Sequence, residues 1–492
     1  MDFCQKLLVV SMVFGCMVTS SWAQTPKEEY EAYKQKMRSE YSNYKNDKQK
    51  EYEAFRKKSN EEYAAFMRER WEQMPVKPAI PIPEKPKPPK PVVVPPDKIP
   101  VEPIVIPYEE ITIPVEVNEL PEIPLPTIEI PEAKPLAYLF FGTPCTVTWS
   151  DAMAYRIEKL DGNYLADLWT RLSEDDYVPM LNDVVQTAND LHLNDWGLVM
   201  LVREMSKALF GEENSEAVFL QAFVLAQLGA KYCMAHNGES IVLLMPLGVD
   251  VYNYPYFEID GEKYFQIQKS VEGDHFEALT AAYPQSQELS LWMEEQPLLS
   301  VSKTKMRRFQ SEQNPSLQVS VSVNKNLIDF YDNYPITAHW ELYSAASLSK
   351  DVKEQLYPEL QRRIKGKGQV EAANLLLNFV QTSFDYATDP EQFGAERPLF
   401  GDESFYYPYN DCEDRSILYS ILVKDLLGLD VVLLEFPGHL ATAVHFTKPV
   451  SGDYLDIDGD AYTVCDPTYI GAPVGLMMPE CRTQELKVVL LK

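Results

Sequence analysis

Residues 409–416 read Tyr-Asn-Asp-Cys-Glu-Asp-Arg-Ser, and they lead into an apolar pattern of helical period that stops at Gly428. Asn410 or Asp411 would cap this helix, because a short polar side chain can accept from its first free N–H groups. Cys412 is therefore expected in the first turn, where the helix dipole favours a thiolate. The alternative is a buried structural cysteine, which fits a run of charged neighbours less well.

Two strands after this helix are expected to bring a histidine and an aspartate together. After a first apolar strand and a Pro-Gly turn, His439 opens a new strand. The following strand, residues 462–466, ends at Asp466. If these two strands pair as a hairpin centred between residues 452 and 453, His439 lies opposite Asp466, at the end of the layer where Cys412 lies.

His445 and Cys465 belong to the same strands but are not expected in the site. His445 is on the same face as His439 but roughly 20 Å further along, at ~3.3 Å per residue. Side chains alternate along a strand, so Cys465 faces away from Asp466 and should be structural. His439 is therefore the candidate base.

These three residue types together support nucleophilic catalysis. We expect His439 to take the proton from Cys412, whose thiolate then attacks a carbonyl carbon. Asp466 would fix the tautomer of the imidazole and stabilise its charged form. The backbone N–H of Cys412, at the helix start, is a candidate oxyanion donor.

The order of these motifs resembles the transglutaminase-like superfamily. A cysteine at a helix start, Gly-His opening a strand and Asp-Pro-Thr closing the next one occur in that order, and the resemblance covers residues 350–492. Residues 379–381, Phe-Val-Gln, and 384–386, Phe-Asp-Tyr, with Asp389, resemble the helix that precedes the nucleophile in bacterial members. The resemblance implies a papain-like α+β catalytic domain within residues 301–492.

The resemblance also implies the reaction. That reaction is cleavage of an amide bond in a protein or peptide through a thioester acyl-enzyme, most simply by water, with transfer to an amine left open. Gln381 and Asn410 are the candidates for a second oxyanion donor. Relatives often carry His-Ala-Trp where this sequence has His439-Leu440-Ala441, so the acyl-acceptor side of the cleft should have a different shape.

No cofactor and no metal ion are expected. Residues 456–460 alternate Asp with other residues, but an EF-hand loop would need Gly and Glu where this chain has Ala461 and Pro467. A hairpin tip is the better interpretation. Cys233 and His236 supply only two ligands, which makes a weak site.

Composition excludes some partners. The 492-residue chain has a formal net charge of −29. Nucleic-acid phosphates and anionic membrane surfaces need clustered cations, so neither is expected as a partner.

Residues 1–23 are typical of a signal peptide, with Lys6 before an apolar run and Ser-Trp-Ala at the end. The mature chain would begin at Gln24 and leave the cytoplasm, to be periplasmic, outer-membrane-associated or secreted. A lipoprotein signal ending at Cys16 is the alternative. No transmembrane segment is expected in the mature chain. Five cysteines remain in it, an odd number that suggests at least one thiol outside a disulfide.

Residues 24–74 contain an aromatic repeat. Tyrosines recur every eleven residues at 30, 41, 52 and 63, each followed three residues later by another aromatic. Eleven residues are three helical turns, so residues 29–72 are predicted to form one charged helix with an aromatic seam. The helix is either solvated, a right-handed coiled coil, or a docking helix for a partner protein or envelope polymer.

The rest of the chain divides by composition. Residues 75–135 hold 19 of the 37 prolines and should be an extended linker, although 104–130 could add an edge strand to the following domain. Residues 136–300 are predicted to be an α+β domain, with helices over 182–192, 196–209 and 215–228 and no chemical motif. Besides the enzyme, two other functions stay open: a non-catalytic envelope or surface interaction protein that keeps the fold, and a functional N-terminal helix that carries the rest as cargo.

Overall fold

The computed structural model describes residues 50–83, 104–113 and 134–491. The chain divides into two units, residues 1–55 and 56–492, and the description below concerns the second. It contains helices and several sheets, so the predicted α+β class is confirmed. The predicted signal peptide and the first aromatic repeats lie outside the described residues.

The end of the predicted aromatic helix is part of a domain core. The helix ends at Glu69, three residues earlier than expected, and β1 (Trp71–Pro75) follows it. Tyr63 is fully buried, with its ring 4.7 Å from that of Trp169. Asn60 accepts a hydrogen bond from the Trp169 indole at 3.0 Å. This stretch is therefore packed against the domain that follows rather than solvated.

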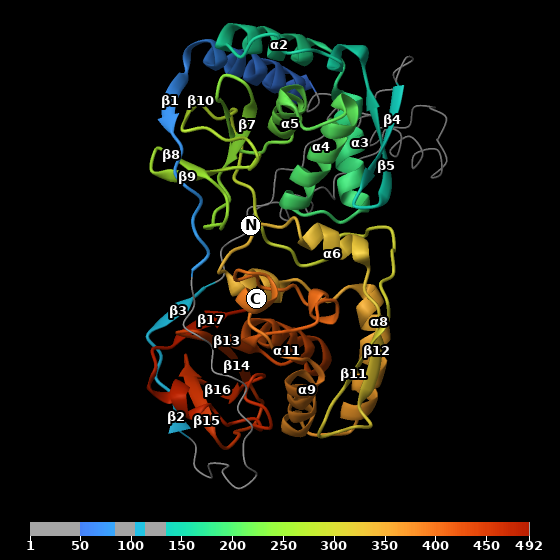
Figure 1. Ribbon diagram of the computed structural model, residues 1–492, viewed down its shortest axis with the longest axis vertical. Helices are drawn as coiled ribbons and strands as arrows, with labels where there is room; N and C mark the ends of the chain where they lie inside the picture. The colour runs from blue at the N-terminus through green and yellow to red at the C-terminus, as the bar shows by residue number, and fades with distance from the viewer. Residues whose placement is uncertain (1–49, 84–103, 114–133, 492) are drawn as a thin grey trace, which may run out of the picture. The chain divides into compact units, whose positions relative to one another are not determined.

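Residues 134–279 of this unit, with β1, are called the first domain below, and they combine a hairpin, helices and a six-stranded sheet (Figure 1). The three predicted helices are confirmed with slightly shifted ends, and α2, which Asp161 caps, was not anticipated. The sheet order is β1-β10-β6-β7-β9-β8. In chain order the elements are β4 (Lys134–Phe140), β5 (Thr143–Trp149), η1 (Asp151–Met153), α2 (Gly162–Glu174), α3 (Val178–Asp190), α4 (Asp195–Phe210), α5 (Ser215–Gln227), β6 (Cys233–His236), β7 (Ile241–Met245), β8 (Tyr256–Ile259), β9 (Glu262–Gln266) and β10 (His275–Leu279).

Residues 307–490, with β2 and β3, are called the second domain below, and they repeat this combination with a seven-stranded sheet in the order β2-β15-β16-β14-β13-β17-β3. Helix α11 packs on β13 and β14 of the sheet. The elements are β11 (Arg307–Gln310), β12 (Gln318–Val321), α6 (Lys325–Tyr331), α7 (Trp340–Ala345), α8 (Lys350–Ile364), α9 (Gln369–Ser383), α10 (Asp389–Gln392), η2 (Glu403–Phe405), α11 (Cys412–Leu427), β13 (Val431–Phe436), β14 (His439–His445), β15 (Asp453–Ile457), β16 (Asp460–Cys465), η3 (Pro479–Thr483) and β17 (Lys487–Leu490), joined by β2 (Ile104–Val105) and β3 (Glu110–Thr112).

The segment around residue 108 joins both edges of this second sheet. β2 pairs in parallel with β15 at one edge, and β3 pairs in parallel with β17 at the other (Figure 1). Ile106, between them, is 6% exposed and belongs to a hydrophobic cluster formed with residues of this sheet. The expected edge strand therefore exists, but it belongs to the second domain and not to the domain that follows in sequence.

Candidate active site

Cys412 begins α11, and a capping box holds the helix start. The Asp411 side chain accepts from the backbone at Asp414, and the Asp414 side chain accepts from the Asp411 N–H at 3.2 Å. These bonds satisfy two backbone donors at the helix start. The N-cap is therefore Asp411 rather than Asn410, and the predicted helix, with its stop at Gly428 in the left-handed region, is confirmed.

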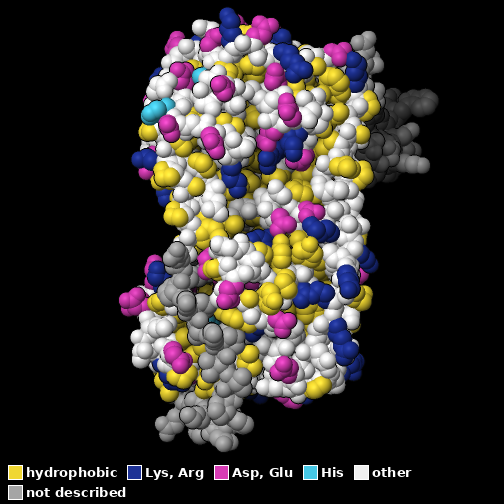
Figure 2. Space-filling view, viewed as in Figure 1, with side chains coloured by type: hydrophobic (Ala, Val, Ile, Leu, Met, Phe, Trp, Pro, Cys, Tyr) yellow, Lys and Arg dark blue, Asp and Glu magenta, His cyan; other side chains and the backbone are white. Residues whose placement is uncertain are grey.

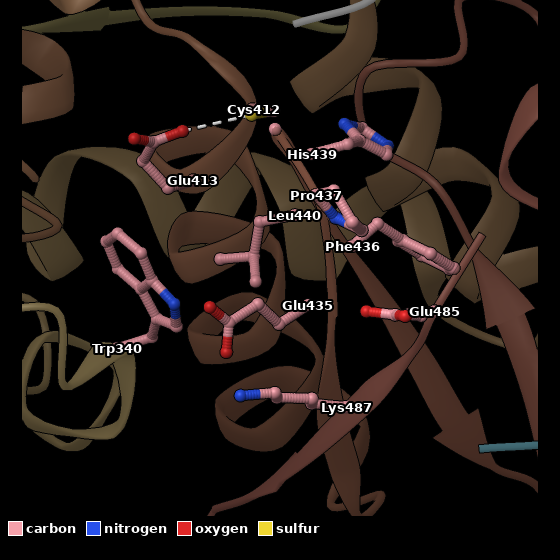
Figure 3. Close-up of a pocket in the computed structure, with 11 residues that line it drawn as sticks. Trp340, Cys412, Glu413, Glu435, Phe436, Pro437, His439, Leu440, Glu485 and Lys487 are labelled. Carbon is pink, nitrogen blue, oxygen red and sulfur yellow. Dashed lines mark hydrogen bonds between the residues drawn. The ribbon is translucent and has the colours of Figure 1, made fainter. Parts of the chain in front are cut away.

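The thiol of Cys412 lies in a mixed environment. The residue is 2% exposed and packs in a small apolar cluster with Trp340, Leu433, Leu440 and Val489. Its Sγ also donates a hydrogen bond to the Glu413 carboxylate at 3.0 Å (Figure 3). That contact stabilises the protonated thiol, so formation of a thiolate needs a nearby positive charge.

His439 and Asp466 form a buried pair. His439 Nε2 lies 2.9 Å from Asp466 Oδ2, and both side chains are almost completely buried. The other oxygen of Asp466 accepts from the backbone N–H groups of Thr468 and Tyr469 at 2.9 and 3.1 Å, which fixes the carboxylate. Because a carboxylate can only accept, the proton on His439 is assigned to Nε2. Nδ1, which has no hydrogen-bond partner among the described residues, is then the basic nitrogen.

The predicted strand register is wrong by two residues. Thr442 pairs with Cys465, whereas the single-hairpin expectation would place it opposite residue 463. The reason is that the connection contains a strand of its own, β15, which turns at Asp458-Gly459 into β16. An even shift keeps each side chain on its face of the sheet, so the side chains of His439 and Asp466 still meet although the two residues are not directly opposite each other.

Cys412 and His439 line the same pocket. Figure 3 shows them at one end of it and Lys487 at the other. Trp340 forms one wall, and Glu435 and Glu485 add carboxylates, so the pocket carries more negative than positive groups. His445 is half-buried, with its ring 5.3 Å from that of Tyr462, and it is not among the residues that line the pocket.

Gln381 holds the loop that carries Asp466. Its amide nitrogen lies 3.0, 2.8 and 3.1 Å from the backbone oxygens of Asp466, Tyr469 and Ala472. Its amide oxygen accepts from Gly471 N–H at 3.1 Å. An oxyanion role for Gln381 stays a prediction, and it would require the amide to leave these bonds.

Asn410, the other oxyanion candidate, is fully buried two residues before Cys412. Its backbone N–H donates to Asp385 at 3.0 Å, whereas neither side-chain amide atom has a hydrogen-bond partner among the described residues. A buried amide in that state is costly. Its oxyanion role also stays a prediction, and it does not line the pocket.

A carboxylate cluster lies beside the site. Asp389, Glu396, Asp411 and Glu413 each offer an oxygen, and these oxygens lie within 4.8 Å of one another. Burial, and then the neighbouring carboxylates, raise the pKa of Asp411 well above its usual value. An all-oxygen donor set of this kind suits a hard cation such as Ca²⁺. In the sequence, only the acidic residues next to Cys412 point to such a cluster. Asp389 and Glu396 come close to them only in the folded chain.

The sequence predicts no metal ion, but if this cluster binds Ca²⁺, the ion should stabilise the protein increasingly as the pH rises above about 4, the ordinary pKa of an aspartate. A carboxyl pKa raised by folding makes the cation-free protein less stable as the pH rises, because the folded state must then ionise buried groups. A cation reverses this cost, since it binds the ionised form. Stabilisation would reach about 2.7 kcal/mol at 100 times the Kd. Thermal unfolding with Ca²⁺ and with chelator measures it.

Asp389→Asn should remove most of this calcium effect. Asp456→Asn, in the exposed acidic hairpin tip, should leave it unchanged. An equal rise in Tm for both variants would mean that the cluster is not the site.

Several residues that line the pocket were not predicted from the sequence. Trp340, on α7, carries no local signal beyond an aromatic suited to a core, and it reaches Cys412 only because α7 packs on α11. Glu435 and Lys487 lie near the ends of β13 and β17, which pair in the sheet, and Glu485 lies just before β17.

No protein-family model matches the sequence, and no curated protein or solved structure was found that matches it. Within the described residues, none of the helices combines the length and apolarity that a membrane crossing requires. On the face seen in Figure 2, the described Lys and Arg side chains are interspersed with Asp and Glu.

Proposed function

We propose that the second domain is a transglutaminase-like, papain-like cysteine enzyme, and that it cleaves amide bonds in a protein or peptide. One observation carries the proposal: His439 is held by buried Asp466 through Nε2, while Nδ1 is left without a described partner and the residue lines one pocket with Cys412. A histidine with a purely structural role would not require a buried acid on one ring nitrogen, an unpaired second ring nitrogen and a cysteine in the same pocket. The resemblance of the Cys, Gly-His and Asp-Pro-Thr motifs supports the same proposal.

The first half of the reaction forms a thioester. His439 Nδ1 takes the proton of the Cys412 thiol, and the thiolate attacks the amide carbonyl carbon. The negative charge on the carbonyl oxygen is met by backbone N–H groups at the start of α11, including that of Cys412. The C–N bond then breaks, the imidazolium gives its proton to the leaving amine, and the acyl group stays on sulfur.

The second half releases the acyl group. His439 takes a proton from water, the hydroxide oxygen attacks the thioester carbonyl, and the C–S bond breaks to give a carboxylic acid and the thiol. If an amine enters instead, a new amide forms. Throughout, Asp466 stabilises the imidazolium without itself accepting the proton.

The alternative is a non-catalytic interaction protein of the envelope or cell surface. The hydrogen bond from Cys412 to Glu413 favours it, since that bond stabilises the unreactive thiol. For either function we propose an exported protein, on the basis of residues 1–23.

Turnover of a peptide mixture tests the proposal. Purified protein, incubated with a digest of cell-envelope proteins with and without a primary amine, should generate new carboxyl termini or amine-containing products detectable by mass spectrometry. Cys412→Ala should abolish them, whereas Cys481→Ala, which removes another buried cysteine of the same domain, should retain them. Products that persist in Cys412→Ala would contradict the proposal.

A further inference from the structure

The two domains share one hairpin sequence. Residues 256–264 and 454–462 both read Tyr, apolar, acidic, Ile, Asp, Gly, acidic, any residue, Tyr. Both turn in the same way, with Asp260 and Gly261 at φ 52° and 84°, and Asp458 and Gly459 at φ 55° and 93°. Two positive φ values in a two-residue turn are typical of a type I′ hairpin.

The strand pairing is also shared, residue by residue. Adding 199 to both members of the pair Cys233↔Leu244 gives Val432↔Ala443, which is also a pair. Adding 198 to Tyr256↔Phe265 gives Tyr454↔Thr463. The sheets correspond strand for strand, with β10-β6-β7-β9-β8 in the first domain and β17-β13-β14-β16-β15 in the second.

The helices correspond as well. In the first domain α3 packs on β5 and α4 on β4, and in the second α8 packs on β12 and α9 on β11. Helix α4 packs on α5 as α9 packs on α11. Helices α5 and α11 are each followed by a glycine in the left-handed region, Gly229 and Gly428, which are also 199 residues apart. The correspondence thus covers the first hairpin, three helices and the last five strands, and it leaves out α2 of the first domain and α6, α7 and α10 of the second.

The reaction residues do not correspond. With the same shifts, Cys412 maps to Glu213, His439 to Ser240 and Asp466 to Gln268. Helix α5 starts two residues after Glu213, so it is shorter than α11 at the end where the nucleophile lies.

A hydrogen-bonded network occupies these positions. Glu213 accepts from Arg203 at 2.7 and 2.6 Å through its two oxygens, and Gln268 Nε2 lies 3.3 Å from Glu213. Gln268 is 3% exposed, and its amide oxygen accepts from Leu243 N–H at 2.8 Å. The equivalents of the nucleophile and of the orienting acid are therefore in direct contact here, and together with Arg203 they form a structural network.

We propose that residues 134–279 are a second copy of the fold of residues 307–490, in which the Arg203–Glu213–Gln268 network has replaced the reaction site, so that this copy is a catalytically silent structural domain. The silence of the first copy rests on the function proposed for the second, whereas the duplication does not. Linker segments meet both edges of each sheet, but they are not equivalent, because β1 and the Lys77 bridge to Tyr256 are antiparallel whereas β2 and β3 pair in parallel.

Matched variants at equivalent positions test it in the full chain. Gln268→Leu should lower Tm by several degrees, because it leaves the Leu243 N–H buried without a partner, yet it should leave the alkylation rate of Cys412 at pH 6 within twofold of the parent. Asp466→Asn should do the reverse, lowering the alkylation rate roughly tenfold with a smaller change in Tm. Arg203→Glu combined with Glu213→Arg should recover much of the Tm lost by Arg203→Glu alone, with alkylation unchanged.

A tenfold loss of Cys412 alkylation in Gln268→Leu, with unchanged Tm, would overturn the silent copy. If instead Asp466→Asn leaves alkylation unchanged, the proposed function fails and the duplication stands. Leu244 and Gln266 are the equivalents of Ala443 and Val464, which pair in the second sheet. A crystal structure in which Leu244 and Gln266 are not paired would overturn the duplication itself.

Discussion

At pH 6, the His439→Ala variant should react with iodoacetamide at Cys412 roughly tenfold more slowly than the parent protein, or slower still. An ordinary thiol has a pKa of about 8.5, so only a small fraction is thiolate at this pH. An imidazolium within reach of the sulfur stabilises the thiolate and can outweigh the opposing contact with Glu413. Without His439, the rate should rise with pH as it does for an ordinary thiol.

Two variants serve as controls for this experiment. Cys412→Ala should abolish fast labelling, because burial raises the pKa of the four other described cysteine thiols and none of these four lines the pocket. His445→Ala removes the histidine at the far end of the same strand and should change little. Loss of labelling in His445→Ala, with normal labelling in His439→Ala, would refute the assignment of the base.

Asp466→Asn should lower turnover of a cleaved peptide by a factor on the order of 10³ to 10⁴, as expected when an imidazole loses the acid that fixes its tautomer. The asparagine has the same shape, and its oxygen can still accept from the N–H groups of Thr468 and Tyr469. Its NH₂ group then faces His439 Nε2, which favours the tautomer with the proton on Nδ1. That proton occupies the nitrogen needed to deprotonate Cys412.

The effect on turnover should be separable from stability. Asp460→Asn changes an exposed carboxylate on the same strand, β16, and should leave both kcat and Tm unchanged. If Asp466→Asn keeps kcat within a factor of about three of the parent, Asp466 is not the orienting acid and the pair with His439 is structural.

Local chemistry explains how much of the site was predictable. The start of α11 follows from an acidic cap before an apolar run, and its end from Gly428, so Cys412 could be placed at a helix start from sequence. His439 and Asp466 were brought together through a wrong register. They still meet because strand alternation depends only on whether the shift is even.

Long-range packing explains the rest. Trp340 enters the pocket from a helix whose position depends on α11 and β17, which no local pattern encodes. Gln381 resembled an oxyanion donor in sequence, but in the fold its amide meets backbone groups up to 91 residues away. The second copy was recognisable in principle. Asp260-Gly261 and Asp458-Gly459 are both typical hairpin turns, yet the remaining identity between the domains is too sparse to suggest a repeat.

Acylation of Cys412 tests the central claim most directly. The protein is mixed with p-nitrophenyl acetate, a generic activated acyl donor, quenched in acid after a short interval, digested and analysed by mass spectrometry. The account predicts one acetyl group on the peptide that contains Cys412, formed fast in the parent, slowly in His439→Ala and not at all in Cys412→Ala. An unmodified Cys412, or acetylation at the same rate in His439→Ala, would contradict it.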